Sequence, residues 1–230
     1  MALPKIIAVD GPAASGKSTL GKRVAESLGY LYFDTGVMYR AITWVALRSG
    51  TEILHELAIT ALANNTPIDI EPPTIDDGRG YDVMVQGQDI TWEIRRPDVD
   101  ANVSVVSAYP GVRRALSAQQ RRIGMRGKVV MVGRDIGTVV LPEADLKIFL
   151  DASAEERARR RYLEQKLKDE TVEYQRILES VKKRDRIDSS REVAPLRPAD
   201  DAVIIDSDGI NADQVYSQVL ALVRAYQVDE

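Results

Sequence analysis

The apolar residues of this 230-residue chain fall into short continuous runs and longer stretches with helical spacing. Continuous apolar runs, which predict short buried strands, lie at 5–10, 30–34, 128–132, 146–150 and 202–205. Helical spacing predicts helices over 20–28, 36–50, 52–63, 99–106, 112–126, 154–168, 171–187 and 211–223. Because most of the strands alternate with helices, the pattern predicts an α/β fold with a five-stranded parallel sheet and right-handed crossovers.

Residues 66–95 interrupt this alternation. The segment carries several prolines, and apolar residues then alternate with period two at Tyr81, Val83 and Val85. Strands are expected at 81–86 and 89–94, with a turn between them and an earlier turn at residues 76–78. The pattern therefore predicts a small antiparallel β-meander inserted into the α/β chain.

A glycine-rich loop joins the first predicted strand to the first predicted helix. Residues 11–18 read Gly-Pro-Ala-Ala-Ser-Gly-Lys-Ser, which matches the phosphate-binding pattern G-x-x-x-x-G-K-[ST]. Gly11 and Gly16 let consecutive backbone N–H groups face a polyphosphate, Lys17 can reach the β- and γ-phosphates, and the Ser18 hydroxyl can ligate Mg²⁺. The alternative is a purely structural glycine turn, and the strand before and helix after the loop disfavour it.

The composition excludes several classes of function. The 31 basic and 35 acidic residues give a net charge of −4, which argues against nucleic acid or an anionic membrane as a main partner. No apolar run approaches the roughly 18 residues of a membrane span, and the N-terminus lacks a signal-peptide pattern. The chain has no Cys, which suits a reducing cytoplasm, and His55 is its only histidine. A His-based triad, a multi-His metal site and a Cys nucleophile are therefore excluded.

Polar residues follow the second and third predicted strands where each ends. Asp34 closes the second strand, and Arg134 and Asp135 follow the third. Ligands of parallel α/β sheets bind at the carboxyl ends of the strands, so these residues and the glycine-rich loop are expected to line one cleft. Asp34 either orients Mg²⁺ through water or simply caps the strand end. Arg134 is expected to have a functional role, because a charge directly after a buried strand has little structural purpose.

The arginines suggest a second phosphate site. A phosphoryl acceptor with its own phosphate needs a guanidinium clamp, and further arginines on a mobile segment can close over the reacting group and exclude water. For most of the arginines at 157–161, the expected role is a solvated helix face paired with neighbouring glutamates.

Several segments together resemble one family over about residues 5–225. They are Gly11–Thr19, Asp34-Thr-Gly-Val-Met-Tyr-Arg40, Gly133-Arg-Asp-Ile-Gly-Thr-Val-Val140, Lys147-Ile-Phe-Leu-Asp-Ala-Ser153 and Val193-Ala-Pro-Leu196 with residues 201–206 beyond. These segments strongly resemble the bacterial cytidylate kinases. The glycine-rich loop is shared by many kinases, whereas the 133–140 segment and the insertion at 66–95 are far more specific.

The resemblance implies the nucleoside-monophosphate kinase variant of the P-loop fold. It implies a core over 1–35, 110–155 and 190–230, an acceptor-nucleotide domain with the β insertion over about 36–109, and a short helical lid over about 156–189. It also implies transfer of the γ-phosphate of ATP to CMP or dCMP with Mg²⁺, giving ADP and CDP or dCDP, in pyrimidine metabolism. The expected protein is a cytoplasmic monomer with no nucleic-acid or membrane partner.

Roles implied by the resemblance attach to individual positions. ATP phosphates would meet Gly11, Pro12, Ala13, Ala14, Ser15, Gly16, Lys17, Ser18 and Thr19, with Ser18 on the metal. The acceptor would meet Thr35, Arg40 and Arg134 at its phosphate end, Ser104, Arg113 and Asp135 at cytosine, and Arg184 and Asp188 at the sugar. The groups that act on the transferring phosphoryl would be Lys17, Arg134, Arg160 and Arg191. Thr35 stands where the family commonly has Ser, and no role transfers to 168–171.

Base selection also has a physical account. A carboxylate accepts a hydrogen bond from the N4 amino group of cytosine, whereas uracil presents an oxygen at that position. Asp135 with Arg113 could therefore select cytosine; the alternative is that Asp135 is a buried structural acid bonded to Arg134 or to backbone N–H groups. Two rival functions are a P-loop kinase for another small molecule, which needs no Arg113–Asp135 pair, and a nucleotide switch, whose N-K-x-D guanine motif is absent.

Overall fold

The computed structural model describes residues 3–167 and 172–226. Its main sheet has five strands in the order β2-β6-β1-β7-β8, and every neighbouring pair is parallel. The strands are β1 Ile6–Asp10, β2 Leu31–Asp34, β6 Val129–Val132, β7 Leu146–Asp151 and β8 Val203–Asp206. The predicted five-stranded parallel sheet is therefore confirmed.

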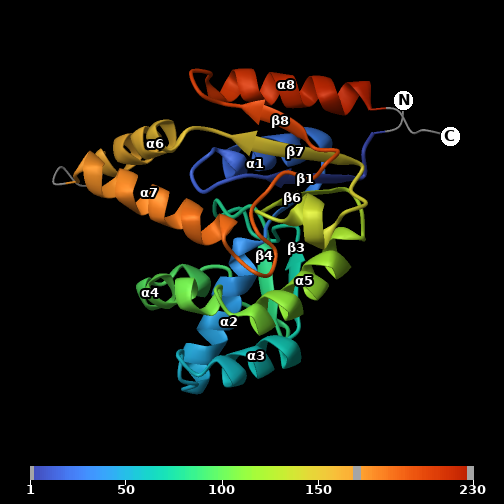
Figure 1. Ribbon diagram of the computed structural model, residues 1–230. Helices are drawn as coiled ribbons and strands as arrows, with labels where there is room; N and C mark the ends of the chain where they lie inside the picture. The colour runs from blue at the N-terminus through green and yellow to red at the C-terminus, as the bar shows by residue number, and fades with distance from the viewer. Residues whose placement is uncertain (1–2, 168–171, 227–230) are drawn as a thin grey trace.

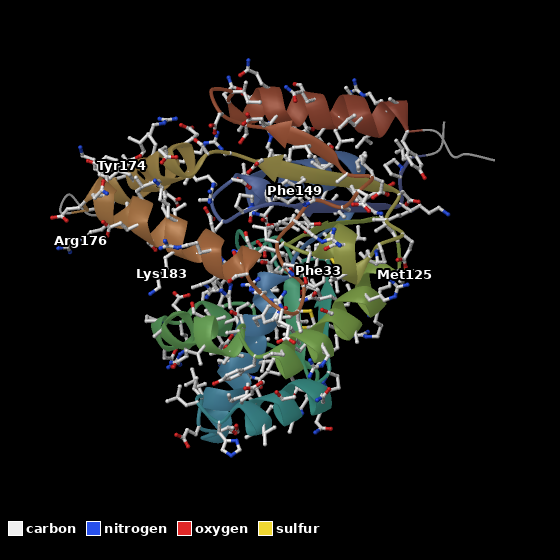
Figure 2. The ribbon with its side chains drawn as sticks, viewed as in Figure 1. Phe33, Met125, Phe149, Tyr174, Arg176 and Lys183 are labelled. Carbon is white, nitrogen blue, oxygen red and sulfur yellow. The ribbon has the colours of Figure 1, made fainter. Side chains whose placement is uncertain are left out.

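The continuous apolar runs form strands because both faces of the sheet are covered. Every residue of β1 and β6 is buried, and Figure 2 shows Phe33 of β2 in the interior of the molecule. Helix α1 (Lys17–Leu28) lies against β6 and ends at Gly29, whose left-handed backbone satisfies the last carbonyls. Helix α8 (Ala212–Ala225) packs beside α1 and starts with a capping box formed by Asn211 and Gln214.

A second group of elements lies on the other side of the sheet from α8 (Figure 1). It contains α2 Gly36–Ser49, α3 Glu56–Asn65, α4 Pro97–Val106 and α5 Pro110–Gly124. It also contains the antiparallel sheet of β3 Ile68–Glu71, β4 Asp82–Val85 and β5 Gln88–Asp89. The inserted β-meander is therefore present, and Tyr81, Val83 and Val85 bury the alternating face as predicted.

Two local expectations were wrong. The strand expected at 89–94 stops at Asp89, because its carboxylate accepts hydrogen bonds from the Thr91 N–H and hydroxyl, and a 3₁₀ turn, η1 (Glu93–Arg95), follows. The helix expected from residue 52 starts at Glu56. His55 is an exposed N-cap, and its ring accepts a hydrogen bond from the Ala58 N–H.

Helices α6 (Ala154–Lys166) and α7 (Tyr174–Ser189) form a hairpin that extends away from the sheet (Figure 1). A small apolar cluster of their own holds them together, formed by Ala158, Ile177, Leu178 and Val181. Arg176 and Lys183 project outward from α7 (Figure 2). The segment 168–171, which the sequence assigned to a variable part of the lid, lies outside the described residues. Within the described ranges, every helix is too short or too polar to cross a membrane.

Candidate active site

The loop between β1 and α1 has the backbone that its glycines predict. Gly11 has φ of 145°, and a Cβ there would lie 2.2 Å from the carbonyl oxygen of Leu150. Gly16 has φ of 98° directly before α1. Both positions therefore favour glycine because of their positive φ angles, and Gly11 also has no space for a Cβ. The resulting loop wraps around the start of α1, where N–H groups and the helix dipole favour an anion.

Lys17 lies inside this loop. Its Nζ donates hydrogen bonds to the Pro12 carbonyl oxygen at 2.5 Å and to the Ser15 hydroxyl at 3.4 Å. Burial, together with the positive charge of Arg134, lowers the pKa of Lys17 from 10.5 to about 7. A phosphate anion beside Nζ would reverse this shift, so the site is electrostatically matched to a polyphosphate.

Ser18 and Asp34 face one another between α1 and the end of β2. The Ser18 hydroxyl donates to Asp34 Oδ2 at 2.9 Å, and Asp34 Oδ1 accepts from the Gly36 N–H at 3.0 Å. Asp34 thus caps the start of α2 and also presents an oxygen next to Ser18. Among the described residues, no cluster of three or more His, Cys, Asp or Glu side chains could hold a metal. A magnesium ion that takes most of its ligands from water and substrate phosphates fits this pair of oxygens.

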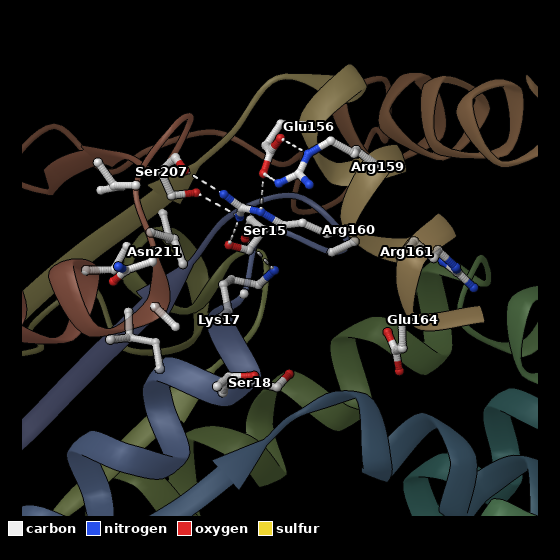
Figure 3. A pocket seen from close by; sticks show the side chains of 18 of the residues that line it. Ser15, Lys17, Ser18, Glu156, Arg159, Arg160, Arg161, Glu164, Ser207 and Asn211 are labelled. Atoms are coloured by element: carbon white, nitrogen blue, oxygen red, sulfur yellow. Dashed lines mark hydrogen bonds and ion pairs between the residues drawn. The ribbon is translucent and has the colours of Figure 1, made fainter. Parts of the chain in front are cut away.

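A cavity of about 1000 Å³ opens beside the loop. Figure 3 shows Ser15, Lys17 and Ser18 on one side and the α6 side chains Arg160 and Arg161 on another. Residues 207 and 209–212 and Val215 close a further side. The Arg160 guanidinium donates to the backbone oxygens of Ser15 and Ser207 and to Glu156 Oε1. One arginine of α6 therefore bridges the phosphate loop and the segment after β8.

Arg157 departs from the expectation of a solvated helix face. It is 4% exposed, and its two terminal nitrogens pair with the Asp185 carboxylate at 2.8 and 2.6 Å. Its guanidinium also donates to the Ala13 carbonyl oxygen at 3.2 Å. Arg157 thus ties α6 and α7 to the phosphate loop. Arg159 follows the expectation, since it is exposed and pairs with Glu156 one turn earlier.

A second group of charges lies at the end of β6. Asp188 of α7 is buried and bridges two arginines: it accepts from Arg134 Nε with one oxygen and pairs with Arg191 through the other. Arg134 also lies close enough to Lys17 to lower the pKa of the lysine. The cations are therefore concentrated between the phosphate loop and the end of α7, where two anionic groups could meet.

Arg113 and Asp135 form a buried pair next to this group. Arg113 donates to Asp135 Oδ2 at 3.0 Å, and the two residues are 4% and 6% exposed. Burial raises the pKa of Asp135, and the charge of Arg113 opposes that shift. Among the described residues, Asp135 makes its side-chain hydrogen bond with Arg113 and none with Arg134 or with a backbone N–H group of η2. Within the described residues, Nε of Arg113 is buried without a hydrogen-bond partner.

The remaining predicted residues lie outside these direct contacts. Arg40 pairs with Asp100 and donates to the Ile94 carbonyl oxygen at 3.1 Å. The Thr35 hydroxyl donates to the Val132 carbonyl oxygen at 3.0 Å. Ser104 and Arg184 are exposed, and across residues 3–167 and 172–226 neither side chain makes a hydrogen bond or ion pair. The ligand contacts assigned to all the site residues stay predictions.

Sequence reasoning missed Asp10, Arg157 and Asp185. Asp10 ends β1 and accepts two backbone hydrogen bonds from the segment after β6. The strand-end argument that selected Asp34 applies equally to Asp10 and could have found it. Arg157 and Asp185 could not be matched from sequence, because their contact depends on how α6 and α7 pack.

Comparisons with known proteins agree with this geometry. The family model described as cytidylate kinase matches residues 7–225. A cytidylate kinase of Herpetosiphon aurantiacus is 48% identical over 223 residues, covering 97% of this chain and 96% of that protein. One of Chloroflexus aggregans is 49% identical over 220 residues, covering 96% and 94%. The solved structure of an uncharacterized Eubacterium ventriosum protein aligns with a TM-score of 0.51 at 12% identity, covering 96% of this chain and 98% of that one, and supports the fold alone.

Proposed function

This chain belongs to the cytidylate kinase family, and we propose that it transfers the γ-phosphate of ATP to CMP or dCMP. The observation that carries the proposal is the buried Arg113–Asp135 pair beside the cations at the end of β6. A kinase for a sugar acid or another small acceptor has no need of a buried carboxylate with an adjacent guanidinium. A cytosine ring uses both, because it offers a donor at N4 and acceptors at N3 and O2.

On the donor side, the loop N–H groups and Lys17 hold the β- and γ-phosphates of ATP. The cavity between the loop, α6 and residues 207–212 takes the remainder of the nucleotide. Arg160, which already reaches Ser15 and Ser207, lies where it can neutralise charge on the triphosphate. Ser18 with Asp34 would hold Mg²⁺, which would offset the negative charge of the ATP phosphates.

On the acceptor side, Arg134 and Arg191 lie on opposite oxygens of Asp188, and Arg134 lies close enough to Lys17 to lower the pKa of the lysine. Arg134 and Arg40 hold the α-phosphate of CMP. An oxygen of that phosphate attacks the γ-phosphorus of ATP, the bond from this phosphorus to the β,γ-bridging oxygen breaks, and ADP leaves with the bond electrons. The acceptor oxygen is already anionic, so positioning and charge stabilisation supply the rate without a general base.

The finer expectations stay predictions under this proposal. They include Mg²⁺ as the metal, a monomer in the cytoplasm, and the division into a core, an acceptor domain at about 36–109 and a lid at about 156–189. The hairpin of α6 and α7, with an apolar cluster of its own, supports treating the lid as a separate unit.

A coupled assay of ADP release tests the proposal over a panel of CMP, dCMP, UMP and AMP. We expect CMP or dCMP to give the highest kcat/KM, with UMP on the order of a hundredfold lower, because a uracil oxygen would face the Asp135 carboxylate. Equal or faster turnover of UMP or AMP would overturn the proposal.

A further inference from the structure

Asp10 is a buried carboxylate to which the proposed mechanism gives no task. It is the last residue of β1, is 5% exposed, and directly precedes Gly11 of the phosphate loop. Its Oδ1 accepts a hydrogen bond from the Ile136 N–H at 2.8 Å, and its Oδ2 accepts one from the Gly137 N–H at 2.7 Å. Because β1 and β6 are parallel neighbours, this carboxylate links the end of one strand to the segment that follows the other.

The two N–H groups belong to the first turn of a short π-helix, η2 (Ile136–Val140). The first N–H groups of any helix lack partners within the helix, and the residue before the helix commonly accepts from them. Here that residue is Asp135, one of the best capping side chains, yet it makes no capping hydrogen bond. Its carboxylate pairs with Arg113 instead, at 3.0 Å.

We propose that Asp10 is a positioning residue for cytosine recognition: by capping η2 in place of Asp135, it leaves the Asp135 carboxylate facing Arg113 and the acceptor base. The inference rests on the proposed function. Without Asp10, the Ile136 and Gly137 N–H groups lose their acceptor, and the Asp135 side chain at the N-cap can accept a hydrogen bond from the Gly137 N–H. Once Asp135 caps its own helix, Arg113 loses its partner and the base loses its acceptor for N4.

The electrostatics agree with a positioning role. Burial raises the pKa of Asp10 to about 7, the two backbone hydrogen bonds oppose this shift, and the charge of Asp135 adds to it. A carboxylate placed in a dry position beside another carboxylate costs stability. The surroundings are also tight: a Cβ at Gly137 would lie 3.4 Å from Asp10 Oδ2 and 3.1 Å from the Lys147 side chain. Both Asp10 oxygens are also hydrogen-bonded to η2, which holds the side chain against its first turn.

The test compares Asp10→Asn with Asp145→Asn. Asp145 is the control, because it too accepts two backbone N–H groups, from Lys5 at 2.7 Å and Ile6 at 2.8 Å, at the opposite end of β1, although both bind its Oδ2 whereas those at Asp10 bind one oxygen each. Both substitutions keep the shape of the side chain but remove the charge and leave only one acceptor oxygen. Asp145 is exposed and lies at the end of the sheet opposite to Arg113. Its substitution is therefore expected to affect the stability of the fold and not the selection of the base.

We expect Asp10→Asn to raise KM for CMP at least tenfold and to lower the ratio of kcat/KM for CMP over UMP at least tenfold, with KM for ATP changed less than threefold. Asp145→Asn should leave the CMP/UMP ratio within twofold of wild type. In an Asp135→Asn background, adding Asp10→Asn should no longer change the ratio, because Asp10 acts through Asp135. An unchanged ratio in Asp10→Asn, or an additive loss in the double variant, overturns the proposal.

Asp10→Ser provides a second variant, since its hydroxyl can accept one hydrogen bond without adding an opposing amide donor. It should show an intermediate loss of the CMP/UMP ratio. If neither variant folds by circular dichroism, Asp10 serves the fold as a whole and the positioning role is wrong. The wild-type panel is measured first. A wild-type protein that does not prefer CMP contradicts the proposed function. A wild-type protein that prefers CMP, with the same CMP/UMP ratio in Asp10→Asn, contradicts only this inference.

Discussion

At the scale of single residues, Lys17 carries a positive charge in surroundings that would favour that charge only with a phosphate anion beside it. Its side chain is buried against Pro12 and Ser15, and its pKa is lowered to about 7. The unfolded chain keeps the ordinary value of 10.5, so the unfolded state binds more protons between pH 7 and 10.5. The lysine therefore destabilises the ligand-free fold most at pH 7 and below, and this penalty disappears as the pH approaches 10.5.

Lys17→Met should remove this penalty together with the activity. We expect turnover to fall on the order of a thousandfold, because the proposed mechanism places the Lys17 charge against the transferring phosphoryl group. The ligand-free melting temperature should rise by a few degrees at pH 6.5, and by clearly less at pH 9.5. Thermal melts of both proteins at the two pH values check this, and equal shifts at both would show that the buried charge is not the cause.

Asp135 gives a second prediction at this scale. In Asp135→Asn the side chain offers both a carbonyl oxygen and an NH₂ group, so it can face the N4 of cytosine or the O4 of uracil. The CMP/UMP ratio of kcat/KM should therefore fall on the order of a hundredfold, while KM for ATP stays nearly constant. Asp69→Asn is the control, because that carboxylate pairs with Arg126, away from the cleft. A ratio that stays at the wild-type value in Asp135→Asn would remove the base-reading role.

At the scale of elements, sequence patterns predicted the features that depend on residues close together in the chain. The apolar runs of β1 and β6 predicted buried parallel strands. The glycine-rich pattern predicted the positive φ angles of the loop after β1. The premature end of β5 was missed, because it depends on where the Asp89 side chain turns. The η2 turn was missed because its cap, Asp10, lies 126 residues earlier in the chain. Partners such as Asp188 for Arg134 come from packing between distant elements, which spacing along one sequence does not encode.

The hairpin of α6 and α7 illustrates how packing changes the role of a residue. Arg157 joins α6 to Asp185 of α7 and to the Ala13 carbonyl oxygen. Arg157→Met breaks a largely buried ion pair, which costs about 3 kcal/mol when one partner stays charged. We expect faster trypsin cleavage within 154–189 and a several-fold higher KM for ATP. Arg159→Met removes one arginine from the same helix but only an exposed pair, so its cleavage rate should match wild type. Equal cleavage of both variants would contradict the assigned role of Arg157.

At the scale of the whole molecule, the parallel sheet brings both proposed nucleotide sites to one edge. The loop after β1 and the segment after β6 are adjacent because the two strands are hydrogen-bonded neighbours, although 120 or more residues separate them in the chain. Helix α7 brings Asp188 to the same edge, and the segment after α7 brings Arg191 there. Ligands at this edge contact segments from the whole chain, so binding should stabilise the fold globally.

Thermal stabilisation by nucleotides tests this arrangement without relying on turnover. A ligand that binds only the folded state at a hundred times its Kd adds about 2.7 kcal/mol, or roughly 5–10 °C for a chain of this size. We expect a shift of this size with CMP, a much smaller one with UMP at the same concentration, and an independent shift with ATP. Asp135→Asn should lose most of the CMP shift and keep the ATP shift, because the proposed function assigns this carboxylate, the partner of Arg113, to the acceptor base. If the variant loses both shifts, the proposed ATP site after β1 and the proposed CMP site after β6 do not bind independently, which contradicts this arrangement.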